Sequence, residues 1–199
     1  MNVTHAANDL PLPSLVLEEL KKSGLTAQRL NEAQVFCQAF FARIAASDAD
    51  LHTPEQWTVL IGGLLHFMQK RQAGTALVRV LNPADSHAGR SLLQIVTDDM
   101  PFLVDTVSMI VSTKLQIHAV IHPMLKVVRD ASGELLGIGG EAGPAESAKP
   151  ESVMHFEIDR VADEAEQAQL IAQVEAALDD VRVAVSDWAA MREIGRAHV

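Results

Sequence analysis

The spacing of apolar residues changes near residue 75, and this change limits the folds that the 199-residue chain can adopt. Before it, apolar side chains recur three or four positions apart, the spacing that places them on one face of a helix. After it, runs rich in β-branched residues alternate with helical segments, as in sheets packed against helices. The sequence therefore predicts an α+β fold with a helical segment at the front.

The helical segment is expected to contain a helix from Ser14 to Lys22, followed by two helices that form an antiparallel hairpin. The last helix has a clear start, because Thr53 can cap it, Pro54 suits its first position and Gln56 completes a capping box. Cys37 is the only cysteine, and it lies in the apolar stripe of the middle helix. Its position predicts a buried thiol, and a single cysteine cannot form an internal disulfide.

Beyond residue 75, strands are expected at residues 76–81, 91–97, 115–129, 134–138 and 152–158, and helices at residues 101–114 and from Asp163 onward. The strand at 115–129 is unusually long, and Pro123 is expected to bend it. The last strand alternates polar and apolar side chains, which predicts a half-buried strand. From residue 91 the order is strand, helix, strand, strand, helix. This is most of a split βαβ, or ferredoxin-like, sheet with its helices on one face.

These patterns divide the chain into a loose N-terminus at residues 1–12, a helical segment at 13–74, an α+β domain at 75–193 and a tail at 194–199. The α+β domain is expected to be incomplete, because the final strand of the unit is missing. A missing strand would leave an open sheet edge, which invites pairing. The tail, with the sequence IGRAHV, resembles the translation of a sequencing adapter, so we expect it to be an artefact at the end of a truncated gene record.

Several function classes are disfavoured by composition and pattern. The net charge of -10 repels phosphate backbones, so nucleic-acid binding is not expected. The start of the chain does not resemble a signal peptide, and no apolar run reaches the ~18 residues of a membrane span, so we expect a cytoplasmic protein without a membrane partner. The glycines at 62–63 and 137–140 match no nucleotide-binding motif, and the serines form no nucleophilic triad. No catalytic residue and no bound NAD are therefore expected within this chain.

The turn at Asp98 is the strongest candidate for a functional site. Asp98 and Asp99 lie between a strand and a helix with Pro101 in its first turn, and Asp105 follows within that helix. Carboxylates at this position can cap the helix or stabilise its positive end. They can also bind an amino group or cation of a regulatory ligand, although no third oxygen ligand for a metal is evident. Both interpretations, a capping turn and a ligand loop, remain open at this point.

The histidines are not expected to bind a metal. His118 and His122 have a spacing that would chelate zinc on a helix, but along a strand their α-carbons lie roughly 13 Å apart. Both are expected on one face of the sheet, partly buried or at an interface. His66 is expected to pack in the helical core, and His155 is given no role.

The same segments resemble a known family. Its pattern is matched by TDDMPFLVD at residues 97–105, IHAVIHP at 117–123 and VRVLNP at 78–83. These segments look like the N-terminal region of the large NAD-specific glutamate dehydrogenases of bacteria. The resemblance extends over roughly residues 35–190. The motif at 97–105 is the most specific of the three.

This resemblance implies an ACT-like module, a ferredoxin-like fold often used to sense amino acids. The parent enzyme would oxidatively deaminate L-glutamate to 2-oxoglutarate and ammonia while reducing NAD, with its catalytic and nucleotide-binding domains far toward the C-terminus. We therefore expect an inactive regulatory or assembly fragment that docks on the C-terminal domains of the same polypeptide. A homo-oligomer and an amino-acid effector are also implied.

Two alternatives remain open. The chain could be a free-standing amino-acid-binding or dimerisation module, although the missing final strand argues against this. It could instead be a small enzyme, for which the paired aspartates at the Asp98 turn are the sole support.

Overall fold

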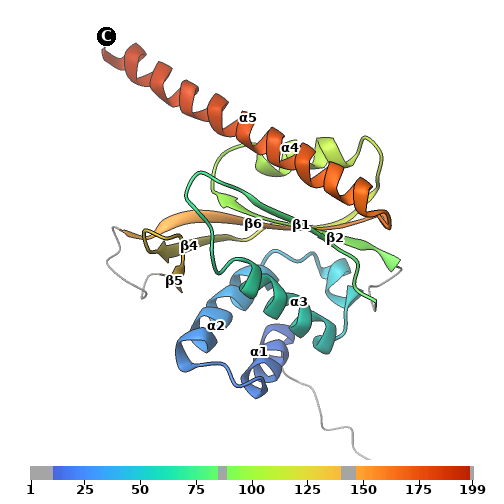
Figure 1. The fold of residues 1–199 in the computed structure, drawn as a ribbon. Coiled ribbons are helices and arrows are strands. Elements are labelled where there is room, and N and C mark those ends of the chain that lie inside the picture. Colours follow the sequence, from blue (N-terminus) through green and yellow to red (C-terminus); the bar gives the residue numbers. More distant parts are fainter. Residues whose placement is uncertain (1–10, 85–88, 140–146, 198–199) are drawn as a thin grey trace, which may run out of the picture.

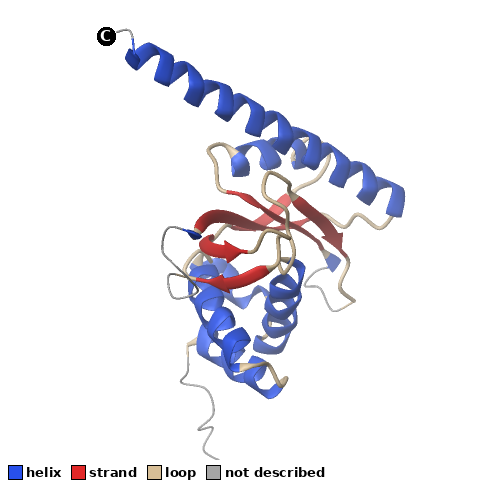
Figure 2. Ribbon diagram, turned by 60° about the vertical axis from the view of Figure 1, so that its left-hand side comes forward, coloured by secondary structure: helices blue, strands red, loops and turns tan. Residues whose placement is uncertain are grey.

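The computed structural model describes residues 11–84, 89–139 and 147–197. A central antiparallel sheet lies between two helical layers, which Figure 2 shows on opposite sides of the strands. Most of the loose N-terminus expected at residues 1–12 lies outside the described residues.

The N-terminal layer contains α1 (Leu12–Lys22), α2 (Ala27–Phe41), the 3-10 helix η1 (Ala46–Leu51) and α3 (Pro54–Phe67). The expected capping box is present at the start of α3, where Gln56 N–H donates to Thr53 Oγ1 at 3.3 Å and Thr53 N–H donates to Gln56 Oε1 at 2.9 Å. α1 packs against both α2 and α3.

The sheet contains β1 (Leu77–Leu81), β2 (Ser91–Asp98), β3 (Ile117–Ile121), β4 (Met124–Arg129), β5 (Leu135–Ile138) and β6 (Lys149–Ile158). Its order is β1-β2-β6-β4-β5, with β3 also paired with β6. The long strand expected at 115–129 is thus divided at Pro123 into β3 and β4, which pair with successive parts of β6. The bend allows the two short strands to follow one long partner.

The position beside β2 is occupied by β1, which precedes it in the chain. β1 pairs with β2 in antiparallel register, with Leu77 opposite Val96 and Leu81 opposite Leu92. In a complete ferredoxin-like unit, the final strand lies on this side of the first strand. The sequence predicted that strand to be missing, but it could not show that β1 covers this side of β2.

The other helical layer contains α4 (Leu103–Val111) and α5 (Glu164–Ala197). These helices of the ferredoxin-like unit share one face of the sheet, as predicted, and Asp163 accepts a hydrogen bond from Glu166 N–H at 2.9 Å at the start of α5. α5 continues well beyond the sheet in Figure 1.

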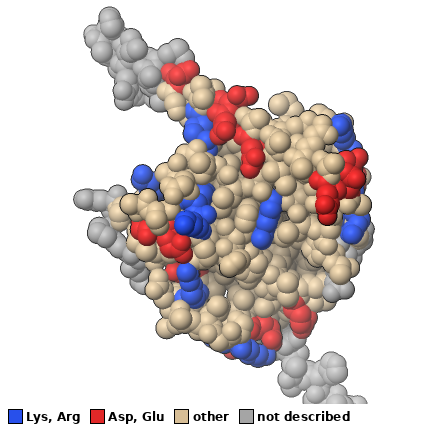
Figure 3. Space-filling view, viewed as in Figure 1, with Lys and Arg blue, Asp and Glu red and all other residues tan. Residues whose placement is uncertain are grey.

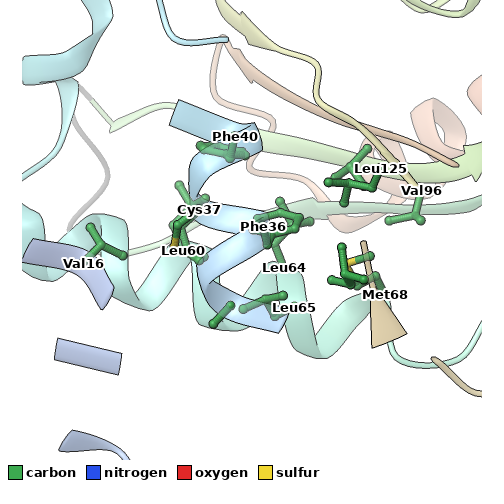
Figure 4. Close-up of a cluster of buried hydrophobic side chains, with 14 of the residues drawn as sticks. Val16, Phe36, Cys37, Phe40, Leu60, Leu64, Leu65, Met68, Val96 and Leu125 are labelled. Atoms are coloured by element: carbon green, nitrogen blue, oxygen red, sulfur yellow. The ribbon is translucent and has the colours of Figure 1, made fainter. Parts of the chain in front are cut away.

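Two apolar cores separate the layers. The core between the N-terminal helices and the sheet, part of which is drawn in Figure 4, contains the following side chains among others: Val16, Phe36, Cys37, Phe40, Trp57, Leu64, Met68, Val96, Leu125 and Val153. The core between the sheet and α4 and α5 includes Leu93, Ile95, Val107, Met154, Phe156, Val174 and Leu178. Alternate residues of each strand therefore belong to different cores.

The observed burial corrects two predictions. β6 is fully buried from Glu151 to Ile158, so it is not the half-buried strand that its alternation suggested. The polar face of β6 is covered by the N-terminal helices rather than by water. His66 was expected in the helical core, but it is exposed on α3.

Candidate functional site at the Asp98 turn

Asp98 lies where three parts of the fold meet. Its Oδ1 accepts a hydrogen bond from Arg71 Nη2 at 2.6 Å, and its Oδ2 accepts one from the backbone N–H of Gly74 at 2.8 Å. Both partners lie between α3 and β1. Arg182 Nε, from α5, is 4.0 Å from Oδ2. One carboxylate at the end of β2 thus connects the N-terminal layer, the sheet and α5.

The same arginine leads into a buried ion cluster. Arg71 Nη2 also donates to Glu151 Oε1 at 2.6 Å, and Arg129 donates to both oxygens of Glu151 through Nε at 2.7 Å and Nη2 at 2.9 Å. The side chains of Arg71 and Glu151 are each 2% exposed and that of Arg129 is 9% exposed. This cluster joins the N-terminal layer to β4 and β6 in a buried region.

The charges of this cluster stabilise one another. Burial opposes the charged form of Arg71, but its hydrogen bonds to Glu151 and Asp98 outweigh burial and raise the pKa of Arg71. Burial likewise opposes ionisation of Asp98, but Arg71 and the N–H of Gly74 outweigh it and lower the pKa of Asp98. Asp98 is therefore ionised at neutral pH, and its role is that of a counter-ion.

A small cavity of about 200 Å³ lies beside the ion cluster. Its lining includes Arg71, Asp98, Arg129, Lys149 and Glu151. Asp98, Glu151, Arg71 and Arg129 are already joined by the hydrogen bonds described above. The capacity of this turn to bind a ligand stays a prediction.

Asp98 and Asp99 do not cap α4. The residue before the helix is Phe102, which has a left-handed backbone with φ of 71° and makes no side-chain capping bond. Asp99 instead accepts a hydrogen bond from the hydroxyl of Ser152 on β6. Asp105 is exposed in the first turn of α4, where a negative charge is favourable for the helix dipole. The capping interpretation was wrong for the aspartate pair because β6 and the loop after α3 use their oxygens.

A second polar group lies on the same face of the sheet, at the other end of β6. Glu157 is fully buried, and its Oε1 lies 2.7 Å from His52 Nε2. Its Oε2 accepts a hydrogen bond from Arg90 Nη1 at 2.9 Å. Burial opposes ionisation of Glu157, but the hydrogen bonds with His52 and Arg90 lower its pKa to about 2. Glu157 is therefore a buried carboxylate that holds the segment before α3 against the sheet.

His155, next to this group, is buried and forms no ion pair with a described residue. Gln94 Nε2 lies 3.2 Å from His155 Nδ1, which leaves the ring proton on Nε2, a buried nitrogen with no hydrogen-bond partner among the described residues. Burial lowers the pKa of His155 to about 4, with a smaller opposing effect from Glu157. His155 is therefore neutral at physiological pH.

Sequence reasoning missed these buried groups. His155 was given no role from sequence, and Arg71, Arg129 and Glu151 were not predicted to form an ion cluster. The available signal was the row of polar residues that alternates with apolar ones along β6. That row indicates buried ion pairs only when a second layer is known to cover it.

The remaining candidates have local partners. His118 Nε2 lies 2.8 Å from Asp159 Oδ1, and His122 Nε2 lies 3.0 Å from Ser152 Oγ. Both histidines are partly buried, as predicted. Cys37 is buried as predicted, and burial raises the pKa of its thiol to about 12.

Two kinds of feature are absent from the described residues. No group of three or more His, Cys, Asp or Glu side chains within residues 11–84, 89–139 and 147–197 is arranged to hold a metal ion. Across those same ranges, no helix has the length and apolar character required to cross a membrane.

Comparison with known proteins gives a consistent result. A family model described as the ACT1 domain of glutamate dehydrogenase matches residues 36–174. A protein named NAD-specific glutamate dehydrogenase from Halomonas elongata is 31% identical in an alignment of 192 residues that covers 92% of this chain and 12% of that protein. A protein of the same name from Pseudomonas aeruginosa is 30% identical in an alignment of 175 residues that covers 84% of this chain and 11% of that protein. No solved structure matches the chain.

Proposed function

Because this chain belongs to the glutamate dehydrogenase family through its ACT1 domain, we propose that it is a non-catalytic regulatory and assembly module of an NAD-dependent glutamate dehydrogenase. The chain spans 12% and 11% of the two relatives, so the reaction of the whole protein belongs to this proposal. That reaction would be the oxidative deamination of L-glutamate to 2-oxoglutarate and ammonia, in the cytoplasm. NAD would bind to other parts of the polypeptide.

The contact geometry of Asp98 is the observation that carries this proposal. Its carboxylate is bonded to Arg71 and to Gly74 N–H, and it faces Arg182 of α5. A carboxylate held in this way is unsuited to proton transfer, because two hydrogen bonds and a cation keep it ionised. It is suited to holding three layers in one arrangement.

α5 provides a route from this junction to the rest of an enzyme. The helix is 34 residues long, and its buried contacts with the sheet lie in its first half, at Leu170, Val174 and Leu178. The C-terminal part of α5, red in Figure 1, extends past the sheet. We propose that this part meets other domains or a second subunit, so that an effector which shifts the layers also shifts the contact.

The experiment has two arms. In the first, the purified chain is assayed for NAD reduction with L-glutamate and titrated calorimetrically with a panel of amino acids. We expect no turnover and heat of binding for at least one amino acid. Measurable turnover would overturn the non-catalytic assignment, and silence across the panel would remove the sensing role and leave only assembly.

In the second arm, residues 11–193 replace the matching region of the Halomonas elongata relative. The chimera should reduce NAD, and Asp98→Asn should change its subunit assembly or its response to amino acids. Asp180→Asn, an exposed carboxylate on α5, is the matched control and should change neither. If Asp98→Asn abolishes turnover while assembly is intact, the turn belongs to the catalytic machinery and the proposal fails.

A further inference from the structure

A cavity of about 500 Å³ lies between α3 and the strands β1 and β2. β1 is the edge strand of the sheet, and Gly63 of α3 has no side chain to fill the space beside it. The walls are mainly apolar and include Val59, Leu60, Leu81 and Leu92. This volume is within the range of small-molecule sites, roughly 300–1,000 Å³. In Figure 3 most charged groups of the visible face lie toward its periphery.

Arg79 of β1 contributes a fixed guanidinium group to the cavity lining. Its Nε and Nη2 donate to Gln94 Oε1 at 2.8 and 2.6 Å, and Nη2 also donates to the carbonyl of Gly63 at 2.9 Å. The guanidinium carbon lies 4.2 Å from the centre of the Phe67 ring. Nη1 bonds to no group in the described part of the chain and is not sealed from solvent, so it can donate to a ligand.

Arg79 differs from neighbouring arginines because no described carboxylate serves as its counter-ion. Arg71 contacts Glu151 and Arg90 contacts Glu157, whereas no carboxylate of residues 11–84, 89–139 or 147–197 forms an ion pair with Arg79. Burial alone lowers the pKa of Arg79. A partly buried cation without a counter-charge is costly, and a ligand carboxylate would remove that cost.

We propose that this cavity binds a small monocarboxylate with a compact apolar body, whose carboxylate pairs with Arg79 and whose body packs against Leu60 and Leu92. A guanidinium forms strong charge-assisted hydrogen bonds with a carboxylate. A second acidic group on the ligand would lie against apolar walls without a partner. The ligand class is therefore a monoanion rather than a dicarboxylate or a phosphate.

The acidic group of the lining does not compete for Arg79. Glu55 is exposed in the first turn of α3, about two helical turns from Gly63, which corresponds to roughly 12 Å along the axis. A free carboxylic acid and an α-amino acid both supply the required carboxylate. Binding depends on the cavity alone. A biological use of the site in regulation rests on the function proposed above.

Isothermal titration of the purified chain with four probes tests this site. The probes are 4-methylpentanoate, its 2-amino acid, its neutral amide and 2-oxoglutarate. We expect 4-methylpentanoate or the 2-amino acid to bind at least about tenfold more tightly than the amide and 2-oxoglutarate. The amide loses the charge-assisted hydrogen bond to Arg79, and 2-oxoglutarate carries a second carboxylate that has no partner. Whichever of these two carboxylates binds more tightly shows whether the ligand is a free carboxylic acid or an α-amino acid.

Two variants, each with a matched control, locate the binding. Arg79→Met should weaken binding of the preferred carboxylate about tenfold or more, whereas Arg160→Met, an exposed arginine after β6, should not. Val59 is 77% exposed on the cavity wall, so Val59→Glu leaves the fold intact and should repel the carboxylate, while Val59→Gln should not. The Val59 pair decides the question even if Arg79→Met fails to fold.

The outcomes separate the two proposals. Equal binding of the acid and the amide, no binding of either carboxylate, or indifference to both Arg79→Met and Val59→Glu would overturn the site. Binding that passes these controls but does not alter turnover or assembly of the Halomonas elongata chimera would confirm the site and contradict the regulatory role.

Discussion

The buried carboxylate of Glu151 provides the sharpest test of how the layers are held together. Glu151 is 1% exposed and is the shared acceptor for Arg71 and Arg129. Glu151→Gln keeps the shape of the side chain but removes its charge and places an amide NH₂ where one oxygen accepted a hydrogen bond. Both guanidinium groups then remain buried, with Asp98 as the nearest remaining carboxylate of the cluster.

The magnitude follows from these contacts. Removing one partner of a buried ion pair costs about 3–5 kcal/mol, because the other charge stays desolvated. Glutamine retains one acceptor and Arg71 retains Asp98, so we expect the lower end, about 3 kcal/mol. Since a domain of this size has about 5–15 kcal/mol of stability, much of the total would be lost. The corresponding change in Tm is a decrease of about 6–12 °C.

Urea unfolding followed by tryptophan fluorescence measures this change, because Trp57 is fully buried in the N-terminal layer. Glu175→Gln removes an exposed carboxylate from α5 and should change the free energy of unfolding by less than about 0.5 kcal/mol. In a double-mutant cycle, Glu151→Gln and Arg129→Met should be non-additive by about 1 kcal/mol or more.

A result for Glu151→Gln that equals the Glu175→Gln control would refute the reasoning. It would mean that water or a rearranged side chain replaces the lost charge without cost. Additive effects of Glu151→Gln and Arg129→Met would likewise show that the two groups do not stabilise each other.

Three further predictions concern groups elsewhere in the fold. The pKa of His155 falls from its ordinary 6.5 to about 4, so the unfolded chain takes up a proton first as pH decreases. The free energy of unfolding should therefore fall by up to about 3 kcal/mol between pH 6.5 and 4. Urea titrations across this range should show the loss, and His155→Gln should reduce the dependence of stability on pH. Gly133→Ala should destabilise the chain by more than about 2 kcal/mol in the same assay, because a Cβ would overlap a backbone carbonyl, whereas Gly24→Ala, which has a similar positive φ and open space, should cost about 1 kcal/mol. Cys37 should stay unmodified by a thiol reagent in the folded chain at pH 8 and react on unfolding, and rapid labelling of the native chain would contradict its burial.

Local sequence signals determined the secondary structure of this protein. The capping box at Thr53, the bend at Pro123 and the cap at Asp163 all depend on residues a few positions apart. Interactions of this range are the same in any fold that keeps the segment, so the sequence alone identified them. The order of strands and helices from residue 91 likewise indicated a ferredoxin-like sheet.

The tertiary structure decided which charges meet. Arg71 and Glu151 are separated by 80 positions, and they come together because the N-terminal layer covers the second face of the sheet. The same covering buries His155 and leaves the cavity beside Arg79 at the sheet edge. Alternation along a strand shows which residues share a face, but it does not show whether water or another layer lies against that face. The sequence therefore predicted a turn at Asp98 between a strand and a helix. The role of Asp98 as the counter-ion of Arg71 depended on the packing of the layers.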